Sequence, residues 1–152
     1  MYRFVKELFD YRRRLPERAD LQLSLTDVLT LSRVHWHGKE LNVPDWSDHS
    51  HSIAFTIATQ ERWFHLIFNA YWEPIKFELP KVPITFSPWK RMIDTDLPSP
   101  DDIGPGVALD DITTYQAQPR STIILRAEHL SSLQLPSLPA FRAASDAGTV
   151  RS

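Results

Sequence analysis

The histidines of this 152-residue chain are spaced in a way that could bind a metal ion. His35 and His37 are two residues apart, and so are His49 and His51. Side chains two positions apart on an extended strand point to the same side, so each pair would share a face. With a nearby aspartate, the pairs could form a zinc or iron site. Such a site needs three or four converging ligands, and spacing alone does not bring the pairs together, so we favour surface histidines.

Paired carboxyl groups are the second candidate for chemistry. Glycoside hydrolysis uses two, roughly 5–5.5 Å apart for retention and roughly 6.5–9.5 Å apart for inversion. The candidates are Asp45 with Asp48, Asp101 with Asp102, Asp110 with Asp111, and Glu73. The adjacent pairs lie in or beside a segment rich in proline and glycine, where aspartates favour turns. Asp45 can hydrogen-bond to turn backbone in the same way. We therefore favour structural roles for these side chains.

Three tryptophans fall at loops or breaks in the pattern: Trp46, Trp72 and Trp89. An exposed indole there could stack on a sugar ring or lie in a protein interface. Packing is the favoured interpretation for each of the three. The sequence has no G-x-S-x-G elbow, no phosphate-binding glycine loop and no dinucleotide fingerprint, so serine-nucleophile and nucleotide chemistry have no support.

Composition and charge exclude several classes of protein. The formal net charge of −2 gives no electrostatic attraction to nucleic acid or an anionic membrane. The absence of cysteine excludes disulfides and thiolate metal sites. The charged first residues do not form the core of a signal peptide, and no apolar run approaches the roughly 20 residues of a membrane span. We expect a cytoplasmic protein without cofactors that binds neither nucleic acid nor membrane.

A helix over residues 2–14 is the first element expected to position these side chains. Phe4, Leu8 and Tyr11 recur at helical spacing, so one side of the helix is apolar. Three arginines follow, and their charge complements the helix dipole at its C-terminal end. A Leu-Pro pair then ends the helix, because proline disfavours the α conformation in the residue before it.

After the helix, the apolar period changes to two, which predicts strands. The expected strands are 29–36, 52–59, 62–70, 75–79, 84–86, 89–93, 112–117 and 121–126. The second and third should form a hairpin, and so should the last two, around residues 118–120. Residues 97–106 contain prolines, glycines and acidic residues, which predicts a surface loop. Asn69 should satisfy backbone groups in the bend that follows its strand.

Short strands at close spacing favour an all-β fold, an antiparallel β-sandwich preceded by one α-helix. We assign residues 1–16 to the helix and residues 17–129 to the sandwich. Residues 130–152 are rich in serine, proline and alanine, which predicts a disordered tail.

Taken in order, several segments resemble the C-terminal part of isoamylase-type glycogen debranching enzymes, which belong to the α-amylase superfamily. The segments that carry the resemblance are Phe9–Pro16, Val34–Gly38, Asp45–Ser47, Ser52–Phe55, Leu66–Pro74, Phe77–Pro80 and Tyr115–Leu125. Their order and spacing, more than any single motif, make the resemblance specific.

The resemblance implies a β-sandwich that packs against a catalytic (β/α)8 barrel, with residues 1–16 resembling the last barrel helix. The barrel and its catalytic carboxylates are absent from this chain, so no catalytic residue is assigned and no enzyme activity is expected of the chain alone. The implied function is that of an accessory domain in glycogen and other α-glucan metabolism. One alternative is an independent α-glucan-binding module, and another is a small metal-dependent enzyme built on the paired histidines. An apolar patch left exposed would predict a barrel partner, a glucan or a homo-oligomer.

Overall fold

The computed structural model describes residues 2–14 and 33–133, which form one α-helix, eight β-strands and a 3-10 helix. The helix α1 (Tyr2–Arg14) has the bounds expected from its apolar spacing. The remaining elements are β1 (Arg33–His37), β2 (Ser52–Ala58), β3 (Arg62–Asn69), β4 (Ile75–Glu78), β5 (Lys90–Asp94), β6 (Ile103–Ala108), β7 (Thr114–Ala117), β8 (Ser121–Glu128) and η2 (Leu130–Leu133). None of the described helices has the length and apolar character that crossing a membrane requires.

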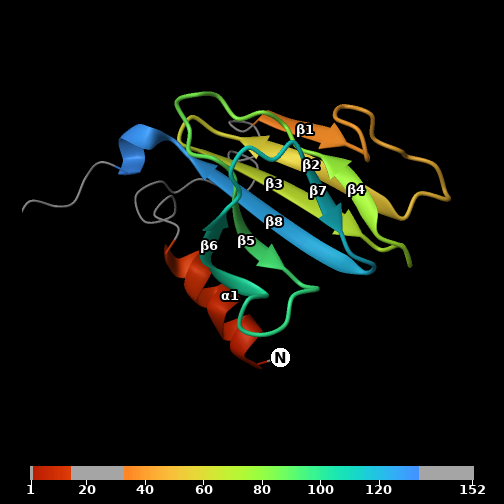
Figure 1. Cartoon of the computed structure of the whole chain (residues 1–152), viewed down its shortest axis with the longest axis horizontal. Helices are drawn as coiled ribbons and strands as arrows, with labels where there is room; N and C mark the ends of the chain where they lie inside the picture. The colour runs from red at the N-terminus through yellow and green to blue at the C-terminus, as the bar shows by residue number, and fades with distance from the viewer. Residues whose placement is uncertain (1, 15–32, 134–152) are drawn as a thin grey trace, which may run out of the picture.

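The strands form two antiparallel sheets, which confirms the expected all-β sandwich (Figure 1). The larger sheet has six strands in the order β1-β2-β3-β8-β5-β6, and the smaller pairs β4 with β7. In Figure 1 the small sheet lies over the middle of the large one, while α1 lies near β5 and β6. We call the face of the large sheet toward β4 and β7 the inner face, and the opposite face the outer face.

The main core lies between the inner face and the small sheet. Burial alternates strictly along β8, from Ser121 to Ala127, as expected for a strand with one covered face. The buried apolar residues of this core are Ala54, Ile67, Phe77, Leu79, Trp89, Ala117, Ile123, Leu125 and Ala127.

Helix α1 covers one half of the outer face. Phe4 and Tyr11 pack with Ile124 of β8 against a small buried cluster of Met92, Ile93 and Ile103. The Arg126 guanidinium lies 5.6 Å from the centre of the Tyr11 ring and donates a hydrogen bond of 3.2 Å to its hydroxyl. The helix thus packs over β8, β5 and β6.

The predicted pairing of the last two strands is wrong. β7 pairs with β4 in the small sheet, whereas β8 lies between β3 and β5 in the large one. Arg120, at a positive φ of 54°, lies in the connection that carries the chain between the sheets, and its N–H donates to the carbonyl of Tyr71. Alternation predicts that both segments are strands, but it does not say which strand each one pairs with.

Other boundaries also differ from the prediction. The end of the expected loop 97–106 belongs to β6, an edge strand that tolerates Pro105 because one side of it has no ladder partner. Residues 84–86 form no strand, and only Phe86 makes an isolated bridge, to His129. The predicted tail starts at residue 130, yet η2 extends to Leu133. The rest of that tail and residues 15–32 lie outside the described residues.

Candidate functional site

The three tryptophans singled out by the sequence lie in different environments. Trp46 and Trp72 are 64% and 63% exposed, respectively, whereas Trp89 is only 3% exposed. The Trp89 indole N–H donates a hydrogen bond of 2.9 Å to the carbonyl of Pro80. Trp89 is therefore a core residue, which agrees with the packing favoured for it, and its indole is too deeply buried for the alternative of stacking on a sugar or lying in an interface.

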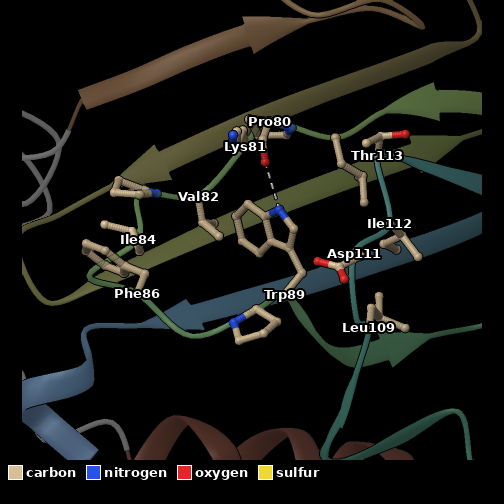
Figure 2. A pocket seen from close by; sticks show the side chains of 13 residues that line it. Pro80, Lys81, Val82, Ile84, Phe86, Trp89, Leu109, Asp111, Ile112 and Thr113 are labelled. Atoms are coloured by element: carbon tan, nitrogen blue, oxygen red, sulfur yellow. Dashed lines mark hydrogen bonds between the residues drawn. The ribbon is translucent and has the colours of Figure 1, made fainter.

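A cavity of about 420 Å³ lies beside Trp89 (Figure 2). Apolar side chains from two segments surround the indole, with Val82, Ile84 and Phe86 on one side and Leu109 and Ile112 on the other. The lining of this cavity is mostly apolar, with Lys81, Asp111 and Thr113 as its polar members, so an apolar side chain could enter it.

The part of the outer face formed by β1, β2 and β3 carries exposed apolar side chains, among them Trp36 and Phe68. The strand register places Trp36, Phe55 and Leu66 side by side across β1, β2 and β3. The Trp36 and Phe55 rings lie 5.0 Å apart, and Phe68 stacks on Phe55 at 6.0 Å. The alternation along β3 puts Phe64, Leu66 and Phe68 on this same face, where Phe68 is 36% exposed.

The loop between β1 and β2 places Trp46 next to these aromatic rings. A Cβ at Gly38 would overlap the carbonyl oxygen of Val43, so this loop conformation requires glycine. The Asp45 carboxylate accepts the Ser47 N–H at 3.0 Å. Trp46 then meets the Trp36 ring edge-on, with 5.4 Å between centroids. We call Trp36, Trp46, Phe55 and Phe68 the aromatic row.

A second, polar pocket lies at the end of the sandwich where β2 begins and β3 ends. This end pocket has a volume of about 320 Å³ and is lined by Lys39, Asp45, His49, Ser50, His51, Ser52, Tyr71, Glu73 and Ile75. The Tyr71 ring stacks on the His51 ring with 5.9 Å between centroids, and its centroid lies 3.9 Å from that of the Trp72 ring. The sequence marks Trp72 but does not show that its neighbour Tyr71 stacks on His51, because His51 belongs to a different segment.

Asn69 fixes the bend that presents these rings. Its side-chain amide donates to the carbonyls of Glu73, Ala117 and Gln118 at 2.9–3.2 Å, and its side-chain oxygen accepts the Tyr71 N–H at 3.0 Å. This confirms the structural role that the sequence predicted for Asn69. It also ties the bend to the connection between β7 and β8.

The first histidine pair separates into one buried and one exposed side chain. His37 Nδ1 accepts the Asn42 N–H, and its Nε2 lies 2.9 Å from the hydroxyl of Thr56. The same hydroxyl lies 2.9 Å from Nδ1 of His65, which is fully buried. Burial, followed by the neighbouring His37, lowers the pKa of His65 to about 3. Burial, followed by His35, also lowers the pKa of His37. Both rings are therefore neutral at physiological pH.

The second pair, His49 and His51, is exposed at the end pocket. Among the described residues, no group of three or more His, Asp or Glu side chains could hold a metal ion. The structure therefore does not assemble the paired histidines into the metal site considered above.

The acidic candidates have local roles or lie at the surface. Hydrogen bonds from Ser47, its backbone N–H first, lower the pKa of Asp45, which suits a turn carboxylate rather than a general acid. Asp102 pairs with Arg3 of α1. Asp111 occupies a turn with a φ of 52°. Asp48, Glu73, Asp101 and Asp110 are all exposed.

Comparison with protein families identifies this fold. The sequence model for the C-terminal domain of isoamylases 1 to 3 matches residues 35–141, which include all the described strands except the start of β1. The chain belongs to this isoamylase C-terminal domain family. The resemblance drawn from the sequence segments is thereby confirmed.

Plant isoamylases are among the relatives of this isoamylase C-terminal domain. It is 36% identical over 81 residues to isoamylase 1, chloroplastic, of Oryza sativa subsp. japonica, which covers 53% of the chain and 10% of the rice protein. It is 29% identical over 118 residues to isoamylase SU1, chloroplastic, of Zea mays, covering 76% of the chain and 14% of the maize protein. The chain therefore spans only about a tenth to a seventh of these relatives.

A solved structure gives a weaker likeness. A GH30 endoxylanase from Clostridium papyrosolvens C71 aligns with 54% of this chain and 21% of its own, at 10% identity and a TM-score of 0.39. This similarity is too slight to bear on function.

Proposed function

We propose that this isoamylase C-terminal domain is a non-catalytic accessory domain in α-glucan debranching, and that it packs its outer face against a catalytic (β/α)8 barrel. The observation that carries the proposal is the uncovered aromatic row. Trp36, on a sheet face that is apolar across three strands, is 44% exposed, and Trp46, a loop residue whose ring meets that of Trp36, is 64% exposed. Contiguous exposed apolar surface of this kind marks a site for a partner.

The position of helix α1 indicates where the expected partner would pack. The helix packs on the same outer face, beside the aromatic row, through Phe4 and Tyr11. Its other apolar side chains, Val5, Leu8 and Phe9, are exposed. The resemblance makes this helix the one that closes a barrel, so a barrel that continues from α1 would cover these side chains and the aromatic row together.

The local roles of the acidic residues support an accessory function without chemistry. A general acid needs a pKa near the working pH, whereas the pKa of Asp45 is lowered. The proposal therefore predicts that the purified chain alone releases no sugar from glycogen. Location in the cytoplasm remains a prediction, which cell fractionation would check.

Barrel packing can be tested with the chain as bait in an extract of its own cells. The comparison uses the wild-type chain, the double variant Trp46→Ser/Phe68→Ser and the matched control Trp72→Ala. Captured proteins are identified by mass spectrometry. We expect the wild type and the control to retain a barrel-containing α-glucan hydrolase, and the double variant to retain at least about tenfold less, because a few buried aromatic residues carry most interface energy.

Two outcomes would contradict the proposal. One is equal retention of the hydrolase by the double variant, which would place the interface elsewhere. The other is a wild-type dimer that the double variant abolishes in size-exclusion chromatography, with no hydrolase captured. A second copy of the chain would then be the occupant of the aromatic row.

A further inference from the structure

The end pocket combines features that barrel packing does not explain. Its lining is mostly polar, in contrast to the apolar aromatic row. Trp72 lies beside it, on the bend between β3 and β4, with 63% of its surface exposed. Its contact with Tyr71, and the stacking of Tyr71 on His51, hold the ring in place without burying it.

We propose that the end pocket and Trp72 form a binding site for a saccharide. The charges of the lining argue against other ligand classes. Asp45 and Glu73 offer two carboxylates against the single ammonium of Lys39, which disfavours an anion. Within the described chain, no group of three ligands could hold a metal ion. The mixture of carboxylates, serine hydroxyls and one ammonium in the lining suits a neutral ligand rich in hydroxyl groups.

The hydrogen-bonding groups of the pocket match a polyol. The carboxylates of Asp45 and Glu73 can accept hydrogen bonds from ligand hydroxyls, and Lys39 can donate to their oxygens. The hydroxyls of Ser50 and Ser52 can do either. A pocket of about 320 Å³ lies within the usual range of roughly 300–1,000 Å³ for small-ligand sites.

The Trp72 ring supplies the apolar contact that a sugar also requires. One face of a pyranose ring carries C–H groups, and an exposed indole offers a flat apolar surface to it. Because the Asn69 side chain fixes the backbone of the bend, the point from which the Trp72 ring projects is set before a ligand arrives. Preorganisation of this kind reduces the entropy that binding loses.

Affinity electrophoresis in native gels tests the site, with glycogen, a soluble β-glucan and xylan as separate probes. Glycogen is the first choice only because the proposed function concerns α-glucans, whereas the site itself does not depend on barrel packing. Trp72→Ala is compared with Trp46→Ala, since the two indoles are almost equally exposed. We expect at least one probe to retard the wild type and Trp46→Ala, and Trp72→Ala to bind at least about tenfold more weakly.

Three results would overturn the inference: no retardation by any probe, retardation that Trp72→Ala leaves unchanged, or an equal loss in both variants. Glu73→Gln adds a milder change that keeps the side-chain size and should weaken retardation by a smaller factor. The two proposals fail separately, because Trp46 belongs to the aromatic row, whereas Trp72 contacts Tyr71 of the end-pocket lining.

Discussion

The two faces of the six-stranded sheet are both rich in apolar side chains, but the described chain covers them differently. On β3, Ile67 is fully buried against the small sheet, while its neighbour Phe68 on the outer face is 36% exposed. The inner face even buries polar groups, and it satisfies most of them internally, as in the chain of His37, Thr56 and His65. The outer face is covered by α1 only over β8, β5 and β6.

This difference separates residues that stabilise the domain from residues available to a partner. Ordinary surfaces carry scattered apolar side chains, but the aromatic row is contiguous across neighbouring strands. The packing of the inner face gives no reason for Trp36 to remain 44% exposed on the outer face. Such an environment is expected if a partner covers the aromatic row, as proposed above.

The largest expected effect compares the neighbours Ile67 and Phe68. Ile67→Ala should lower the free energy of unfolding by about 2–5 kcal/mol, because it leaves a cavity in the main core. Phe68→Ala removes a larger side chain but should lower it by less than half as much, since that ring is already partly hydrated. Urea denaturation of the isolated chain measures both. A loss for Phe68→Ala that matches the loss for Ile67→Ala would show that the outer face is covered after all.

The second-largest expected effect is a fall in the free energy of unfolding at acidic pH, caused by the buried His65 of the inner face. The pKa of His65 is about 3 in the folded chain against 6.5 for an ordinary histidine. As the pH falls below 6.5, the unfolded chain takes up a proton that the folded chain does not. Stability present above pH 6.5 is therefore lost progressively toward pH 3, by about 2 kcal/mol near pH 5. Denaturation midpoints between pH 7 and pH 5 check this.

The matched variant for the acid effect is His65→Gln, which cannot titrate. We expect it to be less stable at neutral pH but to show a flatter dependence of stability on pH in this window. An unchanged slope would assign the acid effect to other groups.

The smallest expected effect concerns the exposed apolar surface itself. An apolar dye such as ANS should bind the native chain at the aromatic row, and Trp46→Ser/Phe68→Ser should reduce its fluorescence. Trp72→Ser removes an equally exposed indole from a polar setting and should change the signal less. If Trp72→Ser had the larger effect, the end pocket would be the main apolar site, and the contrast between the two surfaces would have to be reversed.

Local sequence patterns predicted the elements better than their partners. The apolar spacing of α1 and the alternation in β2, β3 and β8 place these elements within one or two residues of their observed bounds, because covalent geometry fixes which side chains share a face. Pairing depends on contacts between distant segments. β7 and β8 therefore resembled a hairpin, although they belong to different sheets. β6 was missed because an edge strand tolerates the proline and glycines that predict a loop.

The candidate sites show the same difference between features set by local sequence and features set by contacts between distant segments. All three tryptophans fall at breaks in the strand pattern, and the sequence favours packing for each of them. Trp89 is buried in the main core, whereas Trp46 and Trp72 are 64% and 63% exposed, and no local pattern distinguishes these two environments. The stacking of Tyr71 on His51 joins two segments about twenty residues apart, so no local pattern could show the end pocket.

The sequence by itself determined the family, the all-β class, the amphipathic helix and the two-sided character of the strands, since these depend on residue types and on the fixed period of the backbone. Only the tertiary structure decided which apolar face is closed and which stays open. That choice depends on where the small sheet and α1 pack on the large sheet, and both positions arise from long-range contacts.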